Sequence, residues 1–365
     1  MNKNIILCVL FLLAVGLFVN CSGPSDYMVL DEIRYVDAFP QTFLLDNGVE
    51  VDLESLDIIG VKDFCIYDSL LVLSTTDKEG FWSFVSLSDY RFLGKFLTQG
   101  QGPYEFYSNP FVSSSEVKLF NENEENVAII YHFDKGRLYK MNINESIKNN
   151  KLNIYTINDS IRPFIFDFVM IDSITFFCKE ISNRETQQIR YILVNDIKIT
   201  PPHLEKLNLA KIREREDFNI LSTITKYEFN SKRFVEMPGH LNYINIYSLD
   251  GSFAKTICIG KRLDHIGKIQ DKNKWTERKD TFSDLRLFPR FWGVAFIDEY
   301  SYTRERTRFP NIMLFDWNGE PLAQLNLNNH ITAFDIDFIN GYLYTLDHKT
   351  DVFCKYDIRE ILEKL

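Results

Sequence analysis

Apolar runs of four to six residues, each preceded by a short polar turn, recur along most of the chain. The phrases that show this are "YDSLLVLSTT" (67–76), "NEENVAIIYHF" (123–133), "IDSITFFCKE" (171–180), "FNSKRFVEM" (229–237), "IDEYSYTRE" (297–305) and "INGYLYTLDH" (339–348). Their turn residues Ser69, Asn126, Ser173, Ser231, Glu299 and Asn340 stand 57, 47, 58, 68 and 41 positions apart. Six copies at a period near fifty residues predict a repeat architecture, either a propeller or a solenoid.

The remainder of each period favours the propeller. The repeated phrase is followed by a second strand and usually by a hairpin, as in "FVSLSDYRFLGKF" (84–96), "IYSLDGSFAKTI" (246–257) and "LFDWNGEPLAQL" (314–325). Asp250-Gly251 and Asn318-Gly319 are hairpin signals because such turns need positive φ. Since little helix intervenes, we expect an all-β fold with four antiparallel strands per unit, a six-bladed β-propeller. The alternative is one large all-β sandwich, or two of them.

The last repeat lacks a fourth strand, because "YLYTLDH" and "VFCKYDI" are followed by the helical text "REILEKL". We predict that an N-terminal segment supplies this strand, either "EIRYVDAF" (32–39) or "TFLLD" (42–46). Pairing of N-terminal and C-terminal strands closes the ring and removes a free sheet edge. Residues 30–365 then form a single domain, and deletion of residues 30–50 is expected to unfold it cooperatively.

Three phrases resemble a known family. "DSLLVLS" with its hairpin and the following "GQGPYEF" resemble the first blade of the TolB-like or NHL-like six-bladed propeller lipoproteins of Gram-negative bacteria, and "FDWNGEPLAQLNL" and "NGYLYTLD" are similar to their last two blades. The resemblance covers essentially the whole mature chain. It implies a propeller fold and an exported lipid anchor, and it supplies no set of catalytic residues. Tyr104 stands where the family usually has a small residue after the proline.

The first twenty residues have the pattern of an export signal. Lys3 is followed by an apolar segment from Ile5 to Val19, which is short for a membrane-spanning helix, and then by Cys21. A cysteine at this place resembles a bacterial lipobox, so we expect Cys21 to be lipidated and residues 21–29 to form a tether. We then expect the protein to be anchored in the cell envelope, at the outer membrane, through contact with the lipid bilayer. The alternative is a cleaved, soluble periplasmic protein.

Composition and charge narrow the possible functions. The chain has 365 residues, of which 45% are hydrophobic, and a formal net charge of −10, which speaks against a nucleic-acid partner. Four cysteines outside the export segment, Cys65, Cys178, Cys258 and Cys354, lie in separate strand-like runs and are expected to be buried thiols. The absence of CxxC, HxH and HExxH spacings gives no sequence support for a metal site, and no cofactor is predicted.

The glycine-rich phrase "QGQGPYEF" (99–106) reads as a joint between two blades rather than a phosphate-binding loop, because no Lys-Ser/Thr and no helix follow it. We expect Gly100 and Gly102 to adopt conformations barred to other residues, and Pro103 to fix the exit direction. Loops often carry function, so Tyr104 and Glu105 are candidate ligand contacts.

A second candidate site is basic. Residues 261–290 contain nine Lys/Arg and five Asp/Glu, and a nearby "RERTR" phrase places Arg304, Arg306 and Arg308 at alternating positions. On a strand this spacing puts all three on one side, where arginine forks suit carboxylate, sulfate or phosphate. The two basic segments are a candidate anion-binding rim around blade five, although charge runs more often simply face water. The alternative is a solvated charged insertion.

Three classes of function remain open. The first is a binding module whose channel face holds a glycan, a peptide or an envelope protein, with no catalytic residues. The second is a lyase or hydrolase acting on an acidic polymer, for which His240 and His348 are weak catalytic candidates because both fall in loops of one face. The third is an assembly partner in an envelope complex. No GxSxG elbow is present, which argues against a common serine hydrolase.

Overall fold

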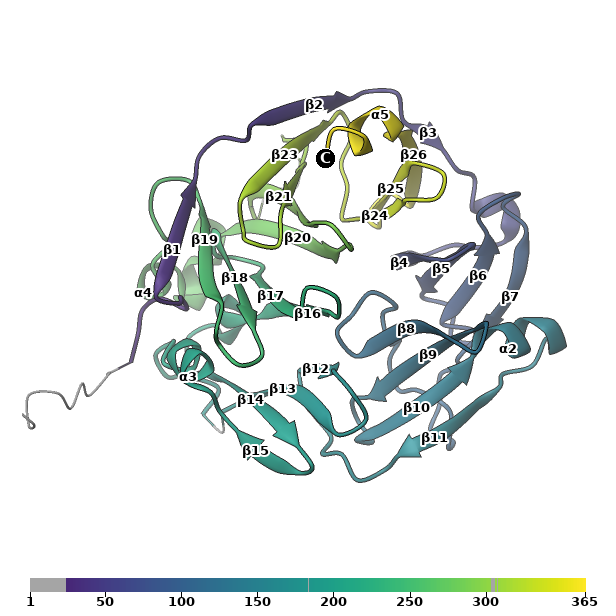
Figure 1. Ribbon diagram of the computed structural model, residues 1–365, viewed down its shortest axis with the longest axis horizontal. Helices are drawn as coiled ribbons and strands as arrows, with labels where there is room; N and C mark the ends of the chain where they lie inside the picture. Colours follow the sequence, from purple (N-terminus) through teal and green to yellow (C-terminus); the bar gives the residue numbers. More distant parts are fainter. Residues whose placement is uncertain (1–23, 183, 303–305, 307) are drawn as a thin grey trace, which may run out of the picture.

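The computed structural model describes residues 24–182, 184–302, 306 and 308–365. Within these residues, six β-sheets stand around a central axis like the blades of a propeller (Figure 1). Each blade is built from four antiparallel strands, and its first strand lies nearest to the axis. The predicted all-β six-bladed propeller is confirmed.

The six blades follow one another along the chain. Blade 1 contains β4 (Val61–Tyr67), β5 (Leu70–Thr75), β6 (Trp82–Ser86) and β7 (Phe92–Phe96); blade 2 contains β8 (Val117–Glu122), β9 (Glu125–His132), β10 (Arg137–Asn142) and β11 (Ile154–Asn158). Blade 3 contains β12 (Asp167–Met170), β13 (Thr175–Ile181), β14 (Gln188–Val194) and β15 (Ile197–Ile199); blade 4 contains β16 (Thr223–Glu228), β17 (Arg233–Pro238), β18 (Tyr243–Ser248) and β19 (Ala254–Ile259). Blade 5 contains β20 (Lys279–Leu287), β21 (Trp292–Tyr300), β22 (Asn311–Phe315) and β23 (Pro321–Leu327); blade 6 contains β24 (Ala333–Asp337), β25 (Tyr342–Asp347), β26 (Val352–Asp357) and β3 (Val49–Glu50).

The continuous apolar runs of the sequence are strands buried on both faces. Successive side chains of a strand point to opposite faces of its sheet. In β9, Ala128 and Ile130 pack against blade 1, whereas Ile129 and Tyr131 pack against blade 3. The same arrangement holds at every junction, so the core consists of hydrophobic clusters between neighbouring blades.

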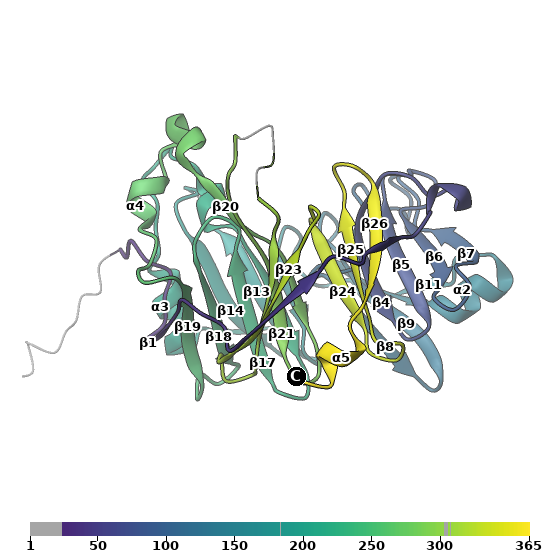
Figure 2. The same cartoon turned by 90° about the horizontal axis from the view of Figure 1, so that it is seen from above.

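The N-terminal segment forms a belt around the outside of three blades (Figures 1 and 2). Strand β1 (Glu32–Val36) pairs in parallel with β19, and β2 (Gln41–Leu45) pairs in parallel with β23, so each adds a fifth strand to a blade. Strand β3 pairs antiparallel with β26 and is the fourth strand of blade 6. Closure by the N-terminal segment is therefore confirmed, but both proposed segments were wrong, because the short pair Val49–Glu50 supplies the strand.

One of the six repeats was placed wrongly. Glu299 lies near the end of β21, whereas the turn equivalent to Ser69 and Asn340 lies between β20 and β21, at residues 288–291. This turn has the sequence "FPRF" and carries no Asn, Asp, Ser or Gly to mark it. The predicted hairpin glycines are confirmed, since Gly251 has φ +73° and Gly319 has φ +81°.

The connections divide the molecule into two faces. Loops from one blade to the next, and from the second to the third strand of a blade, meet at one face, which we call the upper face. It carries η1 (Glu54–Leu56), η2 (Phe218–Leu221), α4 (Ile266–Ile269) and η3 (Lys272–Glu277), with α4 in the upper part of Figure 2. Helix α3 (Pro202–Asn208) begins close to the opposite face, where His203 lies beside Gly251 of the β18–β19 turn. The other helices are α2 (Ile143–Asn149) and α5 (Arg359–Leu362). None of the helices among the described residues is long and apolar enough to cross a membrane.

Candidate ligand-binding channel

Two connected chambers follow the central axis of the propeller. The upper chamber, at the upper face, has a volume of about 610 Å³, and the lower chamber, at the opposite face, has a similar volume. Residues Ser113, Ser114, Ser115 and Lys226 line both chambers, so they form the junction between them. A concave site of this size with converging polar groups is the default place for ligand binding.

Charged residues of the innermost strands, or of the loops leading into them, form much of the channel wall. They include Asp63 on β4, Glu116 before β8, Asp167 on β12, Lys226 on β16, Asp284 and Arg286 on β20, and Asp335 on β24. In the sequence, these residues interrupt apolar strand text, as in "VKDFCIY" and "SDLRLF". The sequence-based search concentrated on loops and missed them, although a charge inside an apolar strand is the signal that identifies a channel wall.

Side-chain hydrogen bonds join neighbouring blades at three of the junctions around the channel. Asp63 accepts hydrogen bonds from the backbone N–H and the hydroxyl of Ser113, both at 2.8 Å, which joins blade 1 to blade 2. Asp167 of blade 3 accepts one from Ser115 at 3.3 Å and one from Thr225 at 2.6 Å, which joins it to blades 2 and 4.

The remaining three junctions are bonded in the same way. The Lys226 ammonium donates to the carbonyl of Leu285 at 2.5 Å, between blades 4 and 5. Asp284 accepts from the N–H of Phe334 at 2.9 Å, between blades 5 and 6. Asp335 accepts from the N–H of Ile66 at 2.8 Å and closes the ring between blades 6 and 1. Most channel charges therefore have a structural role, because they satisfy buried polar groups at the blade junctions.

Arg286 neutralises two of these carboxylates. Its guanidinium contacts Asp284 at 2.8 Å and Asp63 of blade 1 at 3.1 Å, and its side chain is 4% exposed. Asp167 is neutralised by an ion pair with Lys179, which is buried. A buried, hydrogen-bonded ion pair of this kind holds both charges in place and leaves little of either for a ligand.

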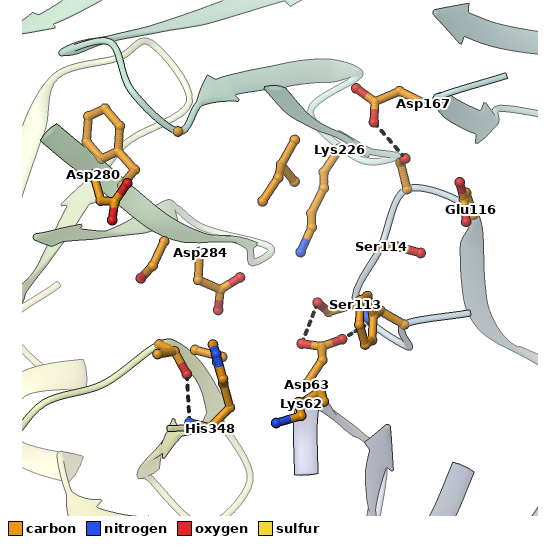
Figure 3. A pocket seen from close by; sticks show the side chains of 18 of the residues that line it. Lys62, Asp63, Ser113, Ser114, Glu116, Asp167, Lys226, Asp280, Asp284 and His348 are labelled. Carbon is orange, nitrogen blue, oxygen red and sulfur yellow. Dashed lines mark hydrogen bonds between the residues drawn. The ribbon is translucent and has the colours of Figure 1, made fainter. Parts of the chain in front are cut away.

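Lys226 is different, because its ammonium has no carboxylate within 4.0 Å in the described part of the chain. Figure 3 shows it reaching into the cavity between Asp284 and the Ser113–Asp63 pair. Burial, and next the charge of Arg286, lower the pKa of Lys226 to about 8, although Asp284 and Asp63 act in the opposite direction.

Glu116 is a second ionisable side chain of the channel without an oppositely charged partner among the described residues. Its carboxylate forms no hydrogen bond or ion pair with the residues that the structure describes, and it lines the upper chamber near Ser114 (Figure 3). Burial, followed by the charges of Asp167 and Asp134, raises the pKa of Glu116 to about 8. At neutral pH this side chain is mainly a protonated acid, which can donate a hydrogen bond to a ligand.

Three neutral polar atoms of the upper chamber also lack a partner among the described residues. They are the hydroxyl oxygens of Ser114 and Ser283 and the amide oxygen of Asn109, all shielded from solvent. Buried polar atoms without partners are costly, so such a group is usually satisfied by water or by a ligand. Together with Glu116 and Lys226, these atoms give the chamber both hydrogen-bond donors and acceptors.

The two candidate histidines, His240 and His348, line this same chamber from the second-to-third-strand loops of blades 4 and 6. His240 Nδ1 lies 3.0 Å from the Lys279 carbonyl oxygen and 3.4 Å from Asp280. Burial, and then the charge of Lys62, lower the pKa of His348, so this ring is mainly neutral near pH 7. The sequence thus placed both residues on the correct face, and a catalytic role for them stays a prediction.

The glycine-rich loop is a joint between blades 1 and 2, as predicted. Blade 2 binds the carbonyl groups of this loop, because Lys135 donates to Gly102 and Glu105, and Tyr139 donates to Pro103. Tyr104 and Glu105 do not line either chamber. Tyr104 is 41% exposed on the upper face, and its role as a ligand contact stays a prediction.

The physical reason for the two glycines of this loop differs from the predicted one. Neither Gly100 nor Gly102 has a positive φ. Instead, the Glu105 carboxylate folds back over both residues and accepts a hydrogen bond from the N–H of Gly102 at 2.8 Å. A Cβ atom at Gly100 would overlap this carboxylate, so the position needs space rather than an unusual backbone conformation.

The predicted basic rim is only partly within the described residues, because Arg304 lies outside them. Arg306 forms two hydrogen bonds to the carboxylate of Asp347, at 2.8 and 2.9 Å, and Arg308 forms an ion pair with Asp298 at 3.2 Å. Neither residue is in a strand, so the predicted one-sided alternation is not present at these two positions. Arg306 and Arg308 do not line the chambers, and anion binding by the rim stays a prediction.

The basic segment 261–290 is not a single insertion. Only its first part connects blades 4 and 5, through α4 and η3, because β20 begins at Lys279. Its charges also divide into two groups. Arg278 pairs with Asp217, and Arg286 is in the channel wall, whereas Lys272 and Lys274 are exposed on η3.

Exposed aromatic side chains gather on the upper face. Of the fourteen exposed Phe, Tyr and Trp residues in the described part of the chain, nine lie in upper-face loops or at a strand end beside them: Tyr104, Tyr107, Phe111, Phe164, Phe166, Trp275, Tyr300, Tyr302 and Phe309. We call these nine residues the aromatic rim. Phe111 and Phe166 are 45% and 47% exposed and line the upper chamber itself. Apolar surface concentrated in this way marks an interaction site.

The four cysteines outside the export segment are free thiols, as expected. Cys178, Cys258 and Cys354 are buried, and Cys65 is half-buried in the wall of the lower chamber. Burial, and next the charge of Asp335, raise the pKa of Cys65, so its thiol is protonated at neutral pH. Cys21 lies outside the described residues.

Comparisons with known proteins find similar solved structures, but they do not assign the chain to a family. No protein-family model matches the chain, and no curated protein matches it. Among solved structures, a member of the DUF4221 family from Bacteroides vulgatus ATCC 8482 is 10% identical, with 86% of this chain and 94% of that chain covered and a TM-score of 0.47. A luciferin-regenerating enzyme is 9% identical, with 85% and 94% covered and a TM-score of 0.43. Raptor of Chaetomium thermophilum is 8% identical, with a TM-score of 0.45; 82% of this chain is covered, but it spans only 27% of Raptor.

The blades and the channel together define the class of this protein, which is a six-bladed β-propeller with a polar central chamber. Propellers support many unrelated functions, so the function has to be argued from the chamber and its rim.

Proposed function

We propose that this protein is a binding module that holds a glycan at the upper chamber without transforming it. The observation that carries the proposal is the combination of exposed aromatic rings and unpartnered polar atoms in one cavity. Phe111 and Phe166 offer flat apolar surfaces at the chamber, whereas Ser114, Ser283 and Asn109 offer hydrogen-bonding atoms inside it. Sugars present both kinds of surface, an apolar ring face and a set of hydroxyl groups.

Three of the channel carboxylates are held in ion pairs, and this favours binding over catalysis. Asp63 and Asp284 are held by Arg286, and Asp167 is held by Lys179. Carboxylates fixed in this way stiffen the wall of the chamber, but they are not free to accept a proton from a substrate.

Binding is tested on the protein from residue 22 onward, which keeps every strand of the propeller. A panel of neutral glycans, acidic glycans, peptides and calcium with and without chelator is screened by thermal shift, because a ligand of the folded state raises the melting temperature. The Kd of each hit is then measured by calorimetry. We expect glycans to bind, and we expect the double substitution Phe111→Ala and Phe166→Ala to weaken their binding at least tenfold.

A matched control is Phe92→Ala, which removes a similarly exposed ring from the outer strand β7. This variant is expected to bind as the unchanged protein does. Glycan binding that survives loss of both Phe111 and Phe166 would contradict the proposal. A screen in which only peptides bind would replace the glycan with a peptide, and a screen without any hit, followed by capture of a stoichiometric envelope protein, would favour the assembly role.

A lyase or hydrolase acting on an acidic polymer is the second candidate, because His240 and His348 line the same chamber. A neutral imidazole is a suitable base for removing a proton next to a carboxylate. The test is turnover of polygalacturonate, followed by the absorbance of the unsaturated product and by the release of reducing ends. Activity that is lost in His240→Ala or His348→Ala would establish an enzyme, and the absence of turnover at any pH from 5 to 9 would reject it.

We also propose that the chain is exported and anchored through Cys21, as in the TolB-like propeller lipoproteins that its sequence resembles. The support is the apolar segment from Ile5 to Val19 followed by cysteine. Such an anchor would hold the protein at a membrane of the cell envelope, which we propose to be the outer membrane. Mass spectrometry of the N-terminal peptide tests this directly: a diacylglyceryl group on Cys21, absent in Cys21→Ser, is expected, and an unmodified mature N-terminus would refute it.

A further inference from the structure

We propose that Lys226 binds a carboxylate of the ligand, so that the glycan held in the upper chamber is an acidic one, rich in uronic acid. This inference rests on the proposed function and names the ligand class of the same chamber. It assigns the anion-binding role to a residue inside the channel and not to the arginines of the rim.

Position is the first reason. Lys226 lies on the innermost strand β16, and it lines both the upper and the lower chamber. Its side chain therefore lies at the junction between the two chambers. In Figure 3 its nitrogen lies in the open part of the cavity. A ligand that enters from the upper face meets this ammonium at the end of its path.

The second reason is that the ammonium keeps unused hydrogen-bonding capacity. It donates to the carbonyl of Leu285 and has no carboxylate within 4.0 Å among the described residues. An ammonium has three donors, and so two remain for a ligand. Other buried cations of the region differ in this respect, since Lys179, Arg190 and Arg286 are each paired with a carboxylate.

The nearby carboxylates do not oppose an anionic ligand as strongly as their number suggests. Both oxygens of Asp63 and both oxygens of Asp284 accept hydrogen bonds from Arg286, Ser113 or backbone N–H groups. Glu116 is mainly protonated near pH 7, because burial raises its pKa to about 8. Its acid then donates a hydrogen bond to an anion instead of repelling it, and the hydroxyl of Ser114 stands beside it without a partner.

A purely structural role is the alternative, in which Lys226 serves only to join blades 4 and 5 through Leu285. That role needs a hydrogen-bond donor but no charge. The two roles can therefore be separated by a variant that keeps a donor and removes the charge, Lys226→Gln, and by one that removes both, Lys226→Met.

The experiment uses trigalacturonate and its methyl ester, which keep the same sugar rings but differ in the negative charge of the carboxyl groups. Calorimetry at pH 7 and low salt gives the ratio of the two Kd values for the protein from residue 22 onward. We expect the free acid to bind at least tenfold more tightly than the ester. We expect this preference to fall to about onefold in Lys226→Gln and in Lys226→Met, while binding of the ester stays nearly unchanged.

Lys118→Met is the matched control. Lys118 is also an inner-strand lysine, on β8, but it lines only the lower chamber and lies over the ring of Phe229. Its loss is expected to leave the preference for the acid intact. If Lys226→Met does not fold, the Gln variant, which keeps the donor to Leu285, decides the matter alone.

Titration gives a second readout that a structural role does not produce. Burial and Arg286 lower the pKa of Lys226 to about 8, and Asp284, Asp63 and Cys65 raise it. The preference for the acid should decline as the pH rises from 7 to 9.5, because the free amine carries no charge. The measurement is made in a Glu116→Gln background, since Glu116 titrates in the same range.

The outcomes separate the two proposals. If the ester and the acid bind equally, or if the Gln variant keeps the preference, the role of Lys226 is refuted and the glycan-binding proposal stands. If neither compound binds, the uronic acid ligand proposed for Lys226 is refuted, and the glycan panel alone decides the glycan-binding proposal. If a tri-aspartate peptide binds and loses its advantage over tri-asparagine in Lys226→Gln, the carboxylate site is correct and the glycan is not.

Discussion

The carboxylate of Asp335 accepts a hydrogen bond from the backbone N–H of Ile66 at 2.8 Å, across 269 positions of sequence. The two residues lie on the innermost strands of blade 6 and blade 1, so this bond closes the ring of side-chain bonds around the channel. The closure of the propeller is thus made twice, by the short outer strand β3 and by this inner carboxylate.

Replacing Asp335 with alanine should weaken the closure. The change removes the acceptor of the half-buried Ile66 N–H and of the buried Ile336 N–H, which together costs about 1–3 kcal/mol. Asp335→Asn keeps an oxygen acceptor of the same shape and should cost clearly less. Both free energies of unfolding are measured by urea denaturation. Equal losses for the two variants would show that the hydrogen bond is not what Asp335 contributes.

The belt formed by the N-terminal segment should contribute to the stability of the fold, as the packing between blades does. Leu30 is 1% exposed and packs in the cluster between blades 3 and 4, whereas Leu44 of β2 is 66% exposed. Leu30→Ala is therefore expected to lower the free energy of unfolding by about 2–5 kcal/mol, as buried leucines do, and Leu44→Ala by less than about 0.5 kcal/mol. Thermal or urea unfolding checks the pair, and a small effect at Leu30 would mean that the belt detaches without loss of the fold.

The repeats were visible in the sequence because each blade buries both faces of its strands. Apolar runs such as "LLVLST" and "VAIIYH" can be read directly, and Gly251 and Gly319 mark two of the hairpins through their positive φ. The turn of blade 5 was missed because its "FPRF" contains no Asn, Asp, Ser or Gly, and β3 was missed because two residues are too few to form a pattern.

The site was less accessible to sequence reasoning for a different reason. Lys226 and Glu116 become neighbours of one cavity only through the ring closure of the blades, and neither stands in a recognisable motif. His240 and His348 were found because loop positions on one face can be counted from strand order. The sequence did not show that the arginines of the rim have acidic partners, but Arg306 forms an ion pair with Asp347 and Arg308 forms one with Asp298.

A double-mutant cycle at the glycine-rich loop tests why Gly100 is a glycine. A Cβ atom there would lie 2.6 Å from Cδ of Glu105, so Gly100→Ala forces the carboxylate away and should cost about 1–3 kcal/mol. In a Glu105→Ala background the obstacle is gone, and the same change should cost at least about 1 kcal/mol less. The free energy of unfolding of the four proteins gives the coupling. Additive effects would show that backbone conformation, rather than space, fixes this glycine.

Glu116 should make the stability of the protein depend on pH in a defined window. Its pKa is raised from 4.5 to about 8 by burial, so between these values the unfolded chain has released a proton that the folded chain keeps. The free energy of unfolding should therefore decrease as the pH rises from 5 to 8, by roughly 1–3 kcal/mol from this group. Glu116→Gln removes the titration. It should match the unchanged protein at pH 5 and exceed it in melting temperature at pH 8.

Glu124→Gln, an exposed change at the other end of the same blade, provides the control and should leave the pH profile as it is. A Glu116→Gln profile parallel to that of the unchanged protein would mean that the Glu116 carboxylate is ionised at neutral pH, and that it would then repel the acidic ligand proposed for Lys226.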